Sequence, residues 1–301
     1  MASTISNVNQ ALVDDKVVTA LRDLKPMLSA FSYRPEKVGK IQNDSVYVPI
    51  GTDPSAQSKT AGTAVTTDGT MAGSQVTLSN LYGAAWDAIE GKMTRSLFES
   101  YWADKIVGAV HSLGKQVVDA ALALVTATNY SNVEHTDKLT KAIADFSLTS
   151  LAQMWEYAVA KIKNQQMSFG MNPAVAGAVF GQSTVANAFA YNGTNFLQTG
   201  VVPQLLGMNT WMYSAFPANS ENLASAIFGK AAILAATAPV EPLTDGGEGE
   251  YTERRIIVDP ESGIGCLYSQ SAHAGGKVAG ECELLYGVLK GQDAVVRHVV
   301  A

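Results

Sequence analysis

The sequence predicts a mixed α+β fold. Apolar residues recur at helical spacing in several segments of the first half, while short alternating segments before and after them have strand character. The C-terminal part is rich in strand patterns that are broken at glycines, and no repeat of fixed period is visible. Helical and strand segments that are partly segregated along a chain are typical of the α+β class.

Composition indicates a large core and a surface poor in charge. The 301 residues can bury a sizeable core and hold one large domain or two modest ones. Charged residues make up 16% of the chain, against about 25% in typical soluble domains. Such a surface favours coverage by partner proteins, although a plain bias toward small residues produces the same composition.

Charge and targeting signals exclude several classes of function. The net charge of −6 argues against a dedicated nucleic-acid binder, which would show a basic patch. No apolar run approaches the roughly 18–20 residues that span a bilayer, and the first residues lack the basic and apolar regions of a signal peptide. Cys266 and Cys282 lie in strand-like segments, which favours buried thiols in a reducing cytoplasm over a disulfide.

The N-terminal region predicts a short helix followed by strands. Pro26 is expected to weaken the end of that helix. The segment FSYRPEKVGKIQNDSVYVPI then turns to strand character. The apolar face of the helix consists of Val13, Val17, Leu21, Leu24 and Leu28.

The stretch from Val48 to Leu78 has almost no large apolar side chain, and Asp53, Lys59 and Asp68 are its only charges. A structureless loop of this length is uncommon inside a compact domain and is usually functional or disordered. The segments SVYVPI before it and SQVTLSN after it alternate like strands. We therefore interpret the stretch as the far end of an extended hairpin that leaves the body of the protein.

A long amphipathic helix is expected to follow this hairpin. Ser96-Leu-Phe-Glu99 has the form of a capping box, and one apolar face then continues to Val125. A helix of roughly 30 residues would be about 45 Å long, and the mean helix has only about 11–12 residues. Gly108 and Gly114 each cost about 1 kcal/mol relative to Ala there, and they mark a bend or close packing against another backbone.

The middle of the chain predicts two shorter helices, and the remainder predicts strands. Ser150-Leu-Ala-Gln153 can cap a helix that ends at Ile162, and Asn172-Pro173 can start another that stops at Gly181. Residues 224–238 form a run of small apolar residues that fits buried strands. Further strands are expected in TWMYSAF, ERRIIVD, GCLYSQSA and KVAGECELLYGVLKGQDAVVRHVV.

The residues show no sign of an active site. The segment SAHAGGK fails the phosphate-loop pattern, since Ser271 stands where a glycine is needed and no Ser or Thr follows Lys277. We expect no catalytic, cofactor-binding or metal-binding residue, although a site built from scattered residues stays open. Core packing is the expected role of Trp86, Trp102, Trp155 and Trp211. Metal-ligand spacing to a Cys, Asp or Glu is absent at His111, His135, His273 and His298.

With this order of elements, the chain resembles the major capsid proteins of tailed bacteriophages, which share the Hong Kong 97 fold. The resemblance covers nearly the whole chain and depends on layout and on passages such as FGMNPAVAGAVFG, LLGMNTWMYSAFP and ASAIFGKAAILAATAP, not on a sharp motif. It implies a fold with an N-terminal arm, an extended β-hairpin loop, a long spine helix, an axial domain and a strand-rich peripheral domain. The implied boundaries are 1–44 for the arm, 45–81 for the loop, 82–147 for the peripheral domain with the spine helix, 148–236 for the axial domain and 237–301 for the closing peripheral strands.

The resemblance also implies a structural role and no enzymatic activity. Copies would assemble as hexamers and pentamers into an icosahedral shell that encloses double-stranded DNA without sequence-specific binding. The implied partners are other copies, a scaffolding protein, a portal and a decoration protein, with no membrane and no cofactor. The protein would be located in the virion after assembly in the host cytoplasm. We name Asp53, Lys59, Asp68 and Met71 as candidate contacts between subunits.

Some family features depart from their usual form here. Certain members carry a helical scaffolding segment ahead of the arm, whereas this chain starts within a few residues of the arm. We therefore expect a separate scaffolding protein, or a segment that is cleaved ahead of this numbering. Certain members cross-link a lysine of the extended loop to an asparagine of a neighbour. Lys59 is the only lysine of the loop, but no asparagine matches a partner motif, so we interpret Lys59 as structural.

Two alternatives stay open. An encapsulin-type nanocompartment shell shares the fold and encloses enzymes, but the arm and the long loop favour the viral version. A soluble α+β enzyme whose loop is an active-site lid belongs to a different class. The loop has the glycines typical of a lid hinge, but no constellation of acid, base or cation side chains accompanies it.

Overall fold

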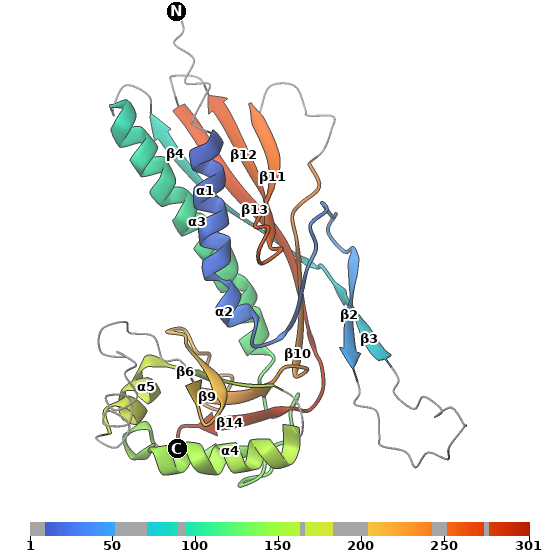
Figure 1. The fold of residues 1–301 in the computed structure, drawn as a ribbon, viewed down its shortest axis with the longest axis vertical. Coiled ribbons are helices and arrows are strands. Elements are labelled where there is room, and N and C mark those ends of the chain that lie inside the picture. The colour runs from blue at the N-terminus through green and yellow to red at the C-terminus, as the bar shows by residue number, and fades with distance from the viewer. Residues whose placement is uncertain are drawn as a thin grey trace, which may run out of the picture.

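The molecule is elongated, with two bodies placed one above the other and a hairpin that projects from one side (Figure 1). Each body contains a six-stranded sheet, and the hairpin is a separate two-stranded sheet. This arrangement confirms the mixed α+β class. The computed structural model describes residues 10–51, 71–89, 94–162, 166–182, 204–242, 252–273 and 277–301.

The upper body is built around one long central strand, β13 (Lys277–Lys290). One edge of β13 pairs with β4, and the other edge pairs first with β12 and then with β10, since Leu285 and Tyr286 pair with β4 and β10 at once. The sheet order is β1-β10-β13-β12-β11, with β4 joined to β13. The remaining strands are β1 (Ser32–Pro35), β4 (Asn80–Ile89), β10 (Ile233–Ala238), β11 (Glu253–Val258) and β12 (Gly265–His273).

Two helices lie side by side on one face of the upper sheet, α1 (Gln10–Asp23) and α3 (Arg95–Ala123) (Figure 1). The 29 residues of α3 confirm the predicted long helix. A short helix, α2 (Lys25–Leu28), follows α1 after a break beside Pro26, as the sequence predicts. The predicted N-terminal apolar face is also confirmed, since its members are all buried in the core: Val13, Val17, Leu21, Leu24 and Leu28.

The start of α3 differs from the prediction in two respects. A strand, β4, occupies residues 80–89 between the hairpin and α3, where the sequence predicts no strand. The N-cap residue of α3 is Thr94, so Ser96 lies inside the first turn and the predicted capping box at Ser96 is wrong. Only Trp86 and Ala88 are buried along β4. Two buried positions give an apolar alternation too short to distinguish a strand from a helix by sequence.

The lower body is a second sheet of order β5-β14-β9-β6-β8-β7. Helix α4 (Leu148–Ile162) lies beneath it and α5 (Pro173–Phe180) lies at one end (Figure 1), with a 3-10 turn at Ile143–Asp145. Every residue of β9 is buried, as in β10 of the other sheet, which confirms buried strands in the run 224–238. The strands are β5 (Lys138–Thr140), β6 (Met167–Met171), β7 (Gln204–Leu205), β8 (Met208–Met212), β9 (Leu223–Gly229) and β14 (Val295–Val299).

The structure shows which residues cap α4 and α5, for which the sequence predicts Ser150 and Asn172. Asn172 caps α5, because its side-chain oxygen accepts a hydrogen bond from the Val175 amide at 2.8 Å, and the helix ends before Gly181 as predicted. Helix α4 begins three residues earlier than predicted, so Ser150 lies in its first turn and the predicted cap at Ser150 is wrong. Ser147 provides its cap by accepting a hydrogen bond from the amide of Ser150 at 3.4 Å. Ser and Asn at these positions satisfy amides that have no partner within the helix.

The final strand corrects the predicted boundaries. Residues 237–301 were expected to form one unit, but β14 pairs with β9 and β5 in the lower sheet, whereas β10 belongs to the upper one. The predicted break of strands at glycines is also wrong for β13, which continues through Gly280 and Gly287. A Cβ at Gly280 would overlap the Trp86 ring, and one at Gly287 would overlap the Thr77 carbonyl, so both glycines allow close packing.

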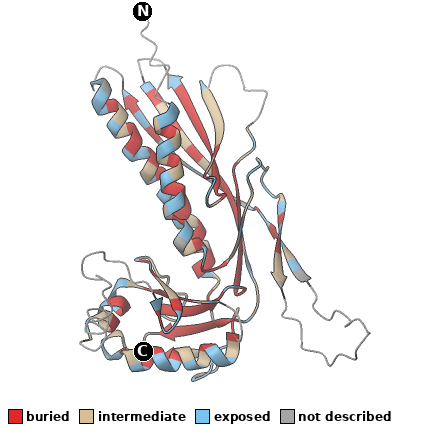
Figure 2. Ribbon diagram, in the orientation of Figure 1, coloured by how far each residue is buried: buried red, intermediate tan, exposed pale blue. Residues whose placement is uncertain are grey.

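Buried residues line the interfaces between helices and sheets in both bodies (Figure 2). One hydrophobic cluster extends through both bodies. Trp86, Trp102 and Trp211 are buried in it and Trp155 is partly buried against it, which confirms that the tryptophans pack in the core. The hairpin consists of β2 (Ser45–Gly51) and β3 (Met71–Thr77) and has a small cluster of its own.

Candidate assembly surfaces

The hairpin is antiparallel at its base, as the sequence predicts. Its register runs from Ser45 opposite Thr77 to Gly51 opposite Met71, and the pair leaves the side of the molecule (Figure 1). The candidate contacts Asp53, Lys59 and Asp68 lie outside the described residues. Met71 is described only as the first residue of β3, so all four candidate contacts stay predictions.

One face of the hairpin base is anchored on the upper sheet. The side chains on this face alternate along β2 and β3, as expected for strands with one buried side. Because Gly287 has no side chain, the Thr77 backbone lies directly against β13. The anchoring cluster consists of Val46, Val48, Val76 and Leu78 of the hairpin with Leu234, Ala236, Ala238 and Leu285 of the sheet.

The other face of the hairpin base is open to solvent. Tyr47 lies across Gly73 of the opposite strand, where a Cβ would overlap the tyrosine ring, yet 45% of Tyr47 is still exposed. Val38 and Ile41, on the segment that leads into β2, are 70% and 58% exposed. These three apolar side chains are therefore left largely uncovered by the described part of the chain.

Buried charges of the lower body hold its loops together. The Arg297 guanidinium is fully buried on β14 and donates to the Glu221 carboxylate at 2.7 Å and to the Asn132 side-chain oxygen at 2.7 Å. Lys161 of α4 pairs with Asp137 at 2.7 Å. Burial raises the pKa of Asp137, but hydrogen bonds from Lys161 and neighbouring groups outweigh it and lower the pKa overall. Each charge has a partner, as buried ion pairs require.

A serine–histidine pair in the same body has no access to a substrate. Nε2 of His298 donates to the Lys141 carbonyl at 3.0 Å, so Nδ1 accepts from the Ser225 hydroxyl at 3.0 Å. The ring stacks on Phe146, with centroids 4.2 Å apart. Both Ser225 and His298 are 0% exposed, and burial lowers the pKa of His298 to about 4. A catalytic pair needs a reachable nucleophile, so this pair is part of the core.

The described residues contain no candidate metal cluster and no candidate membrane-spanning helix. No group of three or more His, Cys, Asp or Glu side chains within the described ranges could hold a metal ion. Cys266 and Cys282 are free and buried, and a hydrogen bond from one thiol to the other, together with burial, raises the pKa of Cys282. No helix that the structure describes is both long and apolar enough to cross a membrane.

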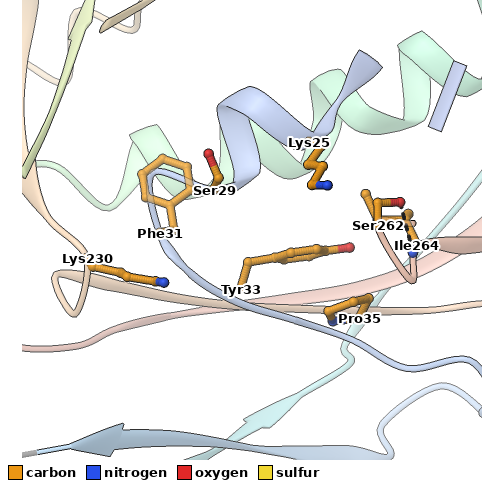
Figure 3. Close-up of a pocket in the computed structure, with 8 residues that line it drawn as sticks. All are labelled: Lys25, Ser29, Phe31, Tyr33, Pro35, Lys230, Ser262 and Ile264. Atoms are coloured by element: carbon orange, nitrogen blue, oxygen red, sulfur yellow. Dashed lines mark hydrogen bonds between the residues drawn. The ribbon is translucent and has the colours of Figure 1, made fainter. Parts of the chain in front are cut away.

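A hollow of about 210 Å³ lies between α2, β1 and the turn that joins β11 to β12 (Figure 3). Lys25 on its rim pairs with Glu261 at 3.4 Å, and the Tyr33 hydroxyl hydrogen-bonds that of Thr237. Burial raises the pKa of Tyr33 well above its usual value, so the phenol stays protonated. Lys25 and Tyr33 are therefore both engaged in contacts within the chain.

Comparison with known proteins identifies the fold. No protein-family model and no curated protein matches this sequence. The capsid of Ralstonia phage GP4 matches with a TM-score of 0.52 at 11% identity, over 89% of this chain and 86% of that one. The capsid of Cyanophage P-SCSP1u matches with a TM-score of 0.50 at 14% identity, over 90% of this chain and 87% of that one. The chain therefore has the Hong Kong 97-like fold of phage capsid proteins.

A virus-like particle from Pyrococcus furiosus also matches, with a TM-score of 0.47 at 12% identity over 95% of this chain and 98% of that one. Identities below 15% show the shared fold and leave the function to be proposed from the surfaces of this chain.

The structure adds surfaces that the sequence does not reveal. Tyr47 lies between Val46 and Val48 on β2, and neighbouring side chains of a strand point to opposite faces. Because the structure shows that the two valines are buried on the sheet, Tyr47 is on the exposed face. Strand β4 has no comparable signal, because Gly and Ala fill much of its length. Val38 and Ile41 lie in an irregular segment, where no periodicity predicts exposure.

Proposed function

We propose that this protein is a structural capsid protein whose copies self-assemble into an icosahedral shell around the double-stranded DNA genome of a tailed phage. The observation that carries the proposal is the projecting hairpin. Its base is anchored by an apolar cluster, while its other face leaves Tyr47 exposed. The same chain has the fold of phage capsid proteins over 89% of its length.

The physics of a shell fits this design. In a closed symmetric assembly each subunit makes several modest contacts, and symmetry multiplies them. The low charged fraction of 16% suits a surface that neighbours cover. A net charge of −6 is compatible with enclosing DNA, because a container does not need to grip its contents. This role requires no catalytic residue and no cofactor.

The finer assignments belong to the same proposal. Copies form hexamers and pentamers, assembled in the host cytoplasm with a scaffolding protein and a portal, and the product is the virion shell. The upper body corresponds to the peripheral domain and the lower body to the axial domain. The hairpin is the extended loop, α3 is the spine helix and residues 1–44 are the arm. In this assignment β14 belongs to the axial domain, because it pairs with β9.

Assembly of the purified chain tests the proposal. The chain is expressed with and without its scaffolding protein, and the products are separated by size-exclusion chromatography with light scattering and imaged by negative-stain microscopy. We expect closed shells of uniform diameter. Protein that stays monomeric or dimeric under crowding, high salt and scaffolding co-expression would contradict a capsid role.

A further inference from the structure

The hollow between α2, β1 and the turn from β11 to β12 is lined by segments that are far apart in the chain (Figure 3). Lys25 comes from α2, Tyr33 from β1 and Ser262 from that turn. Lys230 comes from the turn between β9 and β10. Since β9 belongs to the lower sheet and β10 to the upper one, Lys230 lies where the chain passes between the two bodies.

The floor of the hollow is aromatic. Phe31 is fully buried there, and Figure 3 shows the side chains of Lys25 and Lys230 extending toward the Tyr33 ring. The Tyr33 hydroxyl is hydrogen-bonded to that of Thr237, and burial raises the pKa of Tyr33, so the phenol carries no charge. Charges beside such a wall are less screened than charges in bulk water, so a cation at the rim attracts an anion more strongly.

Both carboxylates near the hollow are already engaged. Asp259 is fully buried and pairs with Arg22 at 3.3 Å. It also accepts hydrogen bonds from the amides of Glu261 and Ser262, at 3.2 and 2.9 Å. Burial raises the pKa of Asp259, but these hydrogen bonds outweigh it and lower the pKa overall. Glu261 pairs with Arg22 at 2.9 Å, which is closer than its contact with Lys25 at 3.4 Å. Arg22 therefore contacts both carboxylates and leaves the lysines of the hollow poorly balanced.

Three lysines converge on the hollow from different elements. Lys25 keeps only the longer contact to Glu261, and Lys230 takes part in no ion pair within the described ranges. Lys37 also has no ion pair with a described residue, and its Cε would lie 3.5 Å from a Cβ on Gly263, beside the rim. The chain as a whole has a net charge of −6. Positive charge gathered at a hollow raises the local concentration of anions.

The size and the donors of the hollow favour a phosphate group. Its volume of about 210 Å³ is smaller than the roughly 300–1,000 Å³ of pockets that enclose a whole ligand, so it fits a single functional group. Lysine ammonium groups only donate, and they bind phosphate oxygens as point charges. A phosphate monoester carries about −1.5 to −2 charges at pH 7, which balances several lysines better than the single charge of a carboxylate.

We propose that this hollow binds a phosphate group, held between Lys25 and Lys230 over the Tyr33 ring, with Lys37 at the rim. The inference goes beyond shell assembly, because one copy of the chain supplies all of these residues. The bound group ties the passage between the bodies to the N-terminal region and stabilises the folded chain by mass action. The phosphate group belongs either to a free small anion or to the backbone of enclosed DNA, and two arms of the experiment separate these sources.

Calorimetric titration of the full chain with inorganic phosphate, at constant ionic strength, tests the site. We expect one saturable site per chain, weakened about tenfold or more in Lys230→Gln and restored to within about threefold of wild type in Lys230→Arg. Lys105→Gln is the matched control, because Lys105 is an exposed lysine of α3 that lies over the Tyr101 ring, away from the hollow. It should bind phosphate as wild type does.

Melting temperatures give a second measurement on the same proteins. Phosphate should raise the melting temperature of wild type and of Lys105→Gln but not that of Lys230→Gln. The absence of saturable binding to wild type, or equal weakening by Lys230→Gln and Lys105→Gln, would overturn the proposal.

A short DNA duplex provides the arm that separates the two sources. A duplex that displaces phosphate from wild type and binds Lys230→Gln more weakly would assign the site to the DNA backbone. A duplex that leaves phosphate binding unchanged would assign the site to a free phosphate group. Neither arm requires shells to form, so failure of shell assembly would contradict the capsid role and leave this site standing.

Discussion

At the residue scale, two glycines of α3 differ in whether a neighbouring side chain requires them. Gly114 lies under Leu24, which joins the helical segment of the N-terminal region to α3. Gly108 faces open space and is exposed. Sequence pattern treats the two alike, because helix propensity depends on residue type and takes no account of the neighbour across the interface.

Alanine substitutions separate these two glycines. Gly108→Ala is expected to raise the free energy of unfolding by about 0.5–1 kcal/mol, since it removes the cost of glycine and meets nothing. Gly114→Ala is expected to be less stable than Gly108→Ala by about 1–3 kcal/mol, because the buried Leu24 must move. Urea unfolding followed by circular dichroism measures both, and equal stabilities would contradict the packing at Leu24.

His298 predicts a pH dependence. Burial lowers its pKa from 6.5 to about 4. Between these values the unfolded chain binds a proton that the folded chain does not, so stability falls as the pH drops from 6.5 toward 4. The loss is on the order of 3 kcal/mol at full effect. The groups that face the ring are Ser225, Phe146 and the carbonyl of Lys141.

Unfolding of wild type and His298→Gln at a series of pH values checks this assignment. The wild-type free energy of unfolding should fall more steeply below pH 6.5 than that of the variant, because glutamine does not titrate. Above pH 7 the difference between the two proteins should be constant. Parallel curves throughout the acid range would show that His298 is protonated in the folded state.

At the scale of elements, α3 holds the upper body together. Leu113→Ala is expected to cost about 2–5 kcal/mol, because Leu113 is only 3% exposed and its removal leaves a cavity. Leu97→Ala in the same helix is the control, since Leu97 is 55% exposed and should cost little. Thermal or urea unfolding of both variants measures the difference. Similar costs would mean that the buried face of α3 is misplaced.

Local signals account for the elements that the sequence predicts well. The cap of α5 is formed by Asn172 and Pro173, and the face of α1 follows from apolar spacing, so both are encoded within a few residues. β4 escapes prediction because Gly and Ala fill much of its length and only Trp86 and Ala88 are buried. The sequence does not predict which sheet β14 joins, because a fully buried strand has the same apolar pattern in either sheet.

At the scale of the whole molecule, we expect residues 53–71 to be dispensable for the fold of the monomer. Deleting residues 53–71 and joining the ends with a tight turn should leave the monomer folded, because Val46, Val48, Val76 and Leu78 keep their cluster on the sheet. The same deletion should abolish shells, since the reaching segment is gone. Melting temperature and negative-stain microscopy provide the two measurements.

Val76→Asp is the control for that deletion. It keeps the tip but places a charge among the apolar residues that anchor the hairpin, where Val76 is 1% exposed, so it should destabilise the monomer. A large loss of stability in the deleted chain itself would show that the tip packs on its own subunit, contrary to the proposed role.

The sequence by itself determined that this is an α+β chain with a long helix, a polar projecting hairpin and no motif for chemistry, because periodicity, caps and composition are local properties. Tertiary structure alone decided which sheet receives each buried strand and which glycine is required by a neighbour. Those outcomes depend on contacts such as Gly114 with Leu24 and Gly287 with Thr77, which join residues far apart in the chain. No local pattern encodes such contacts.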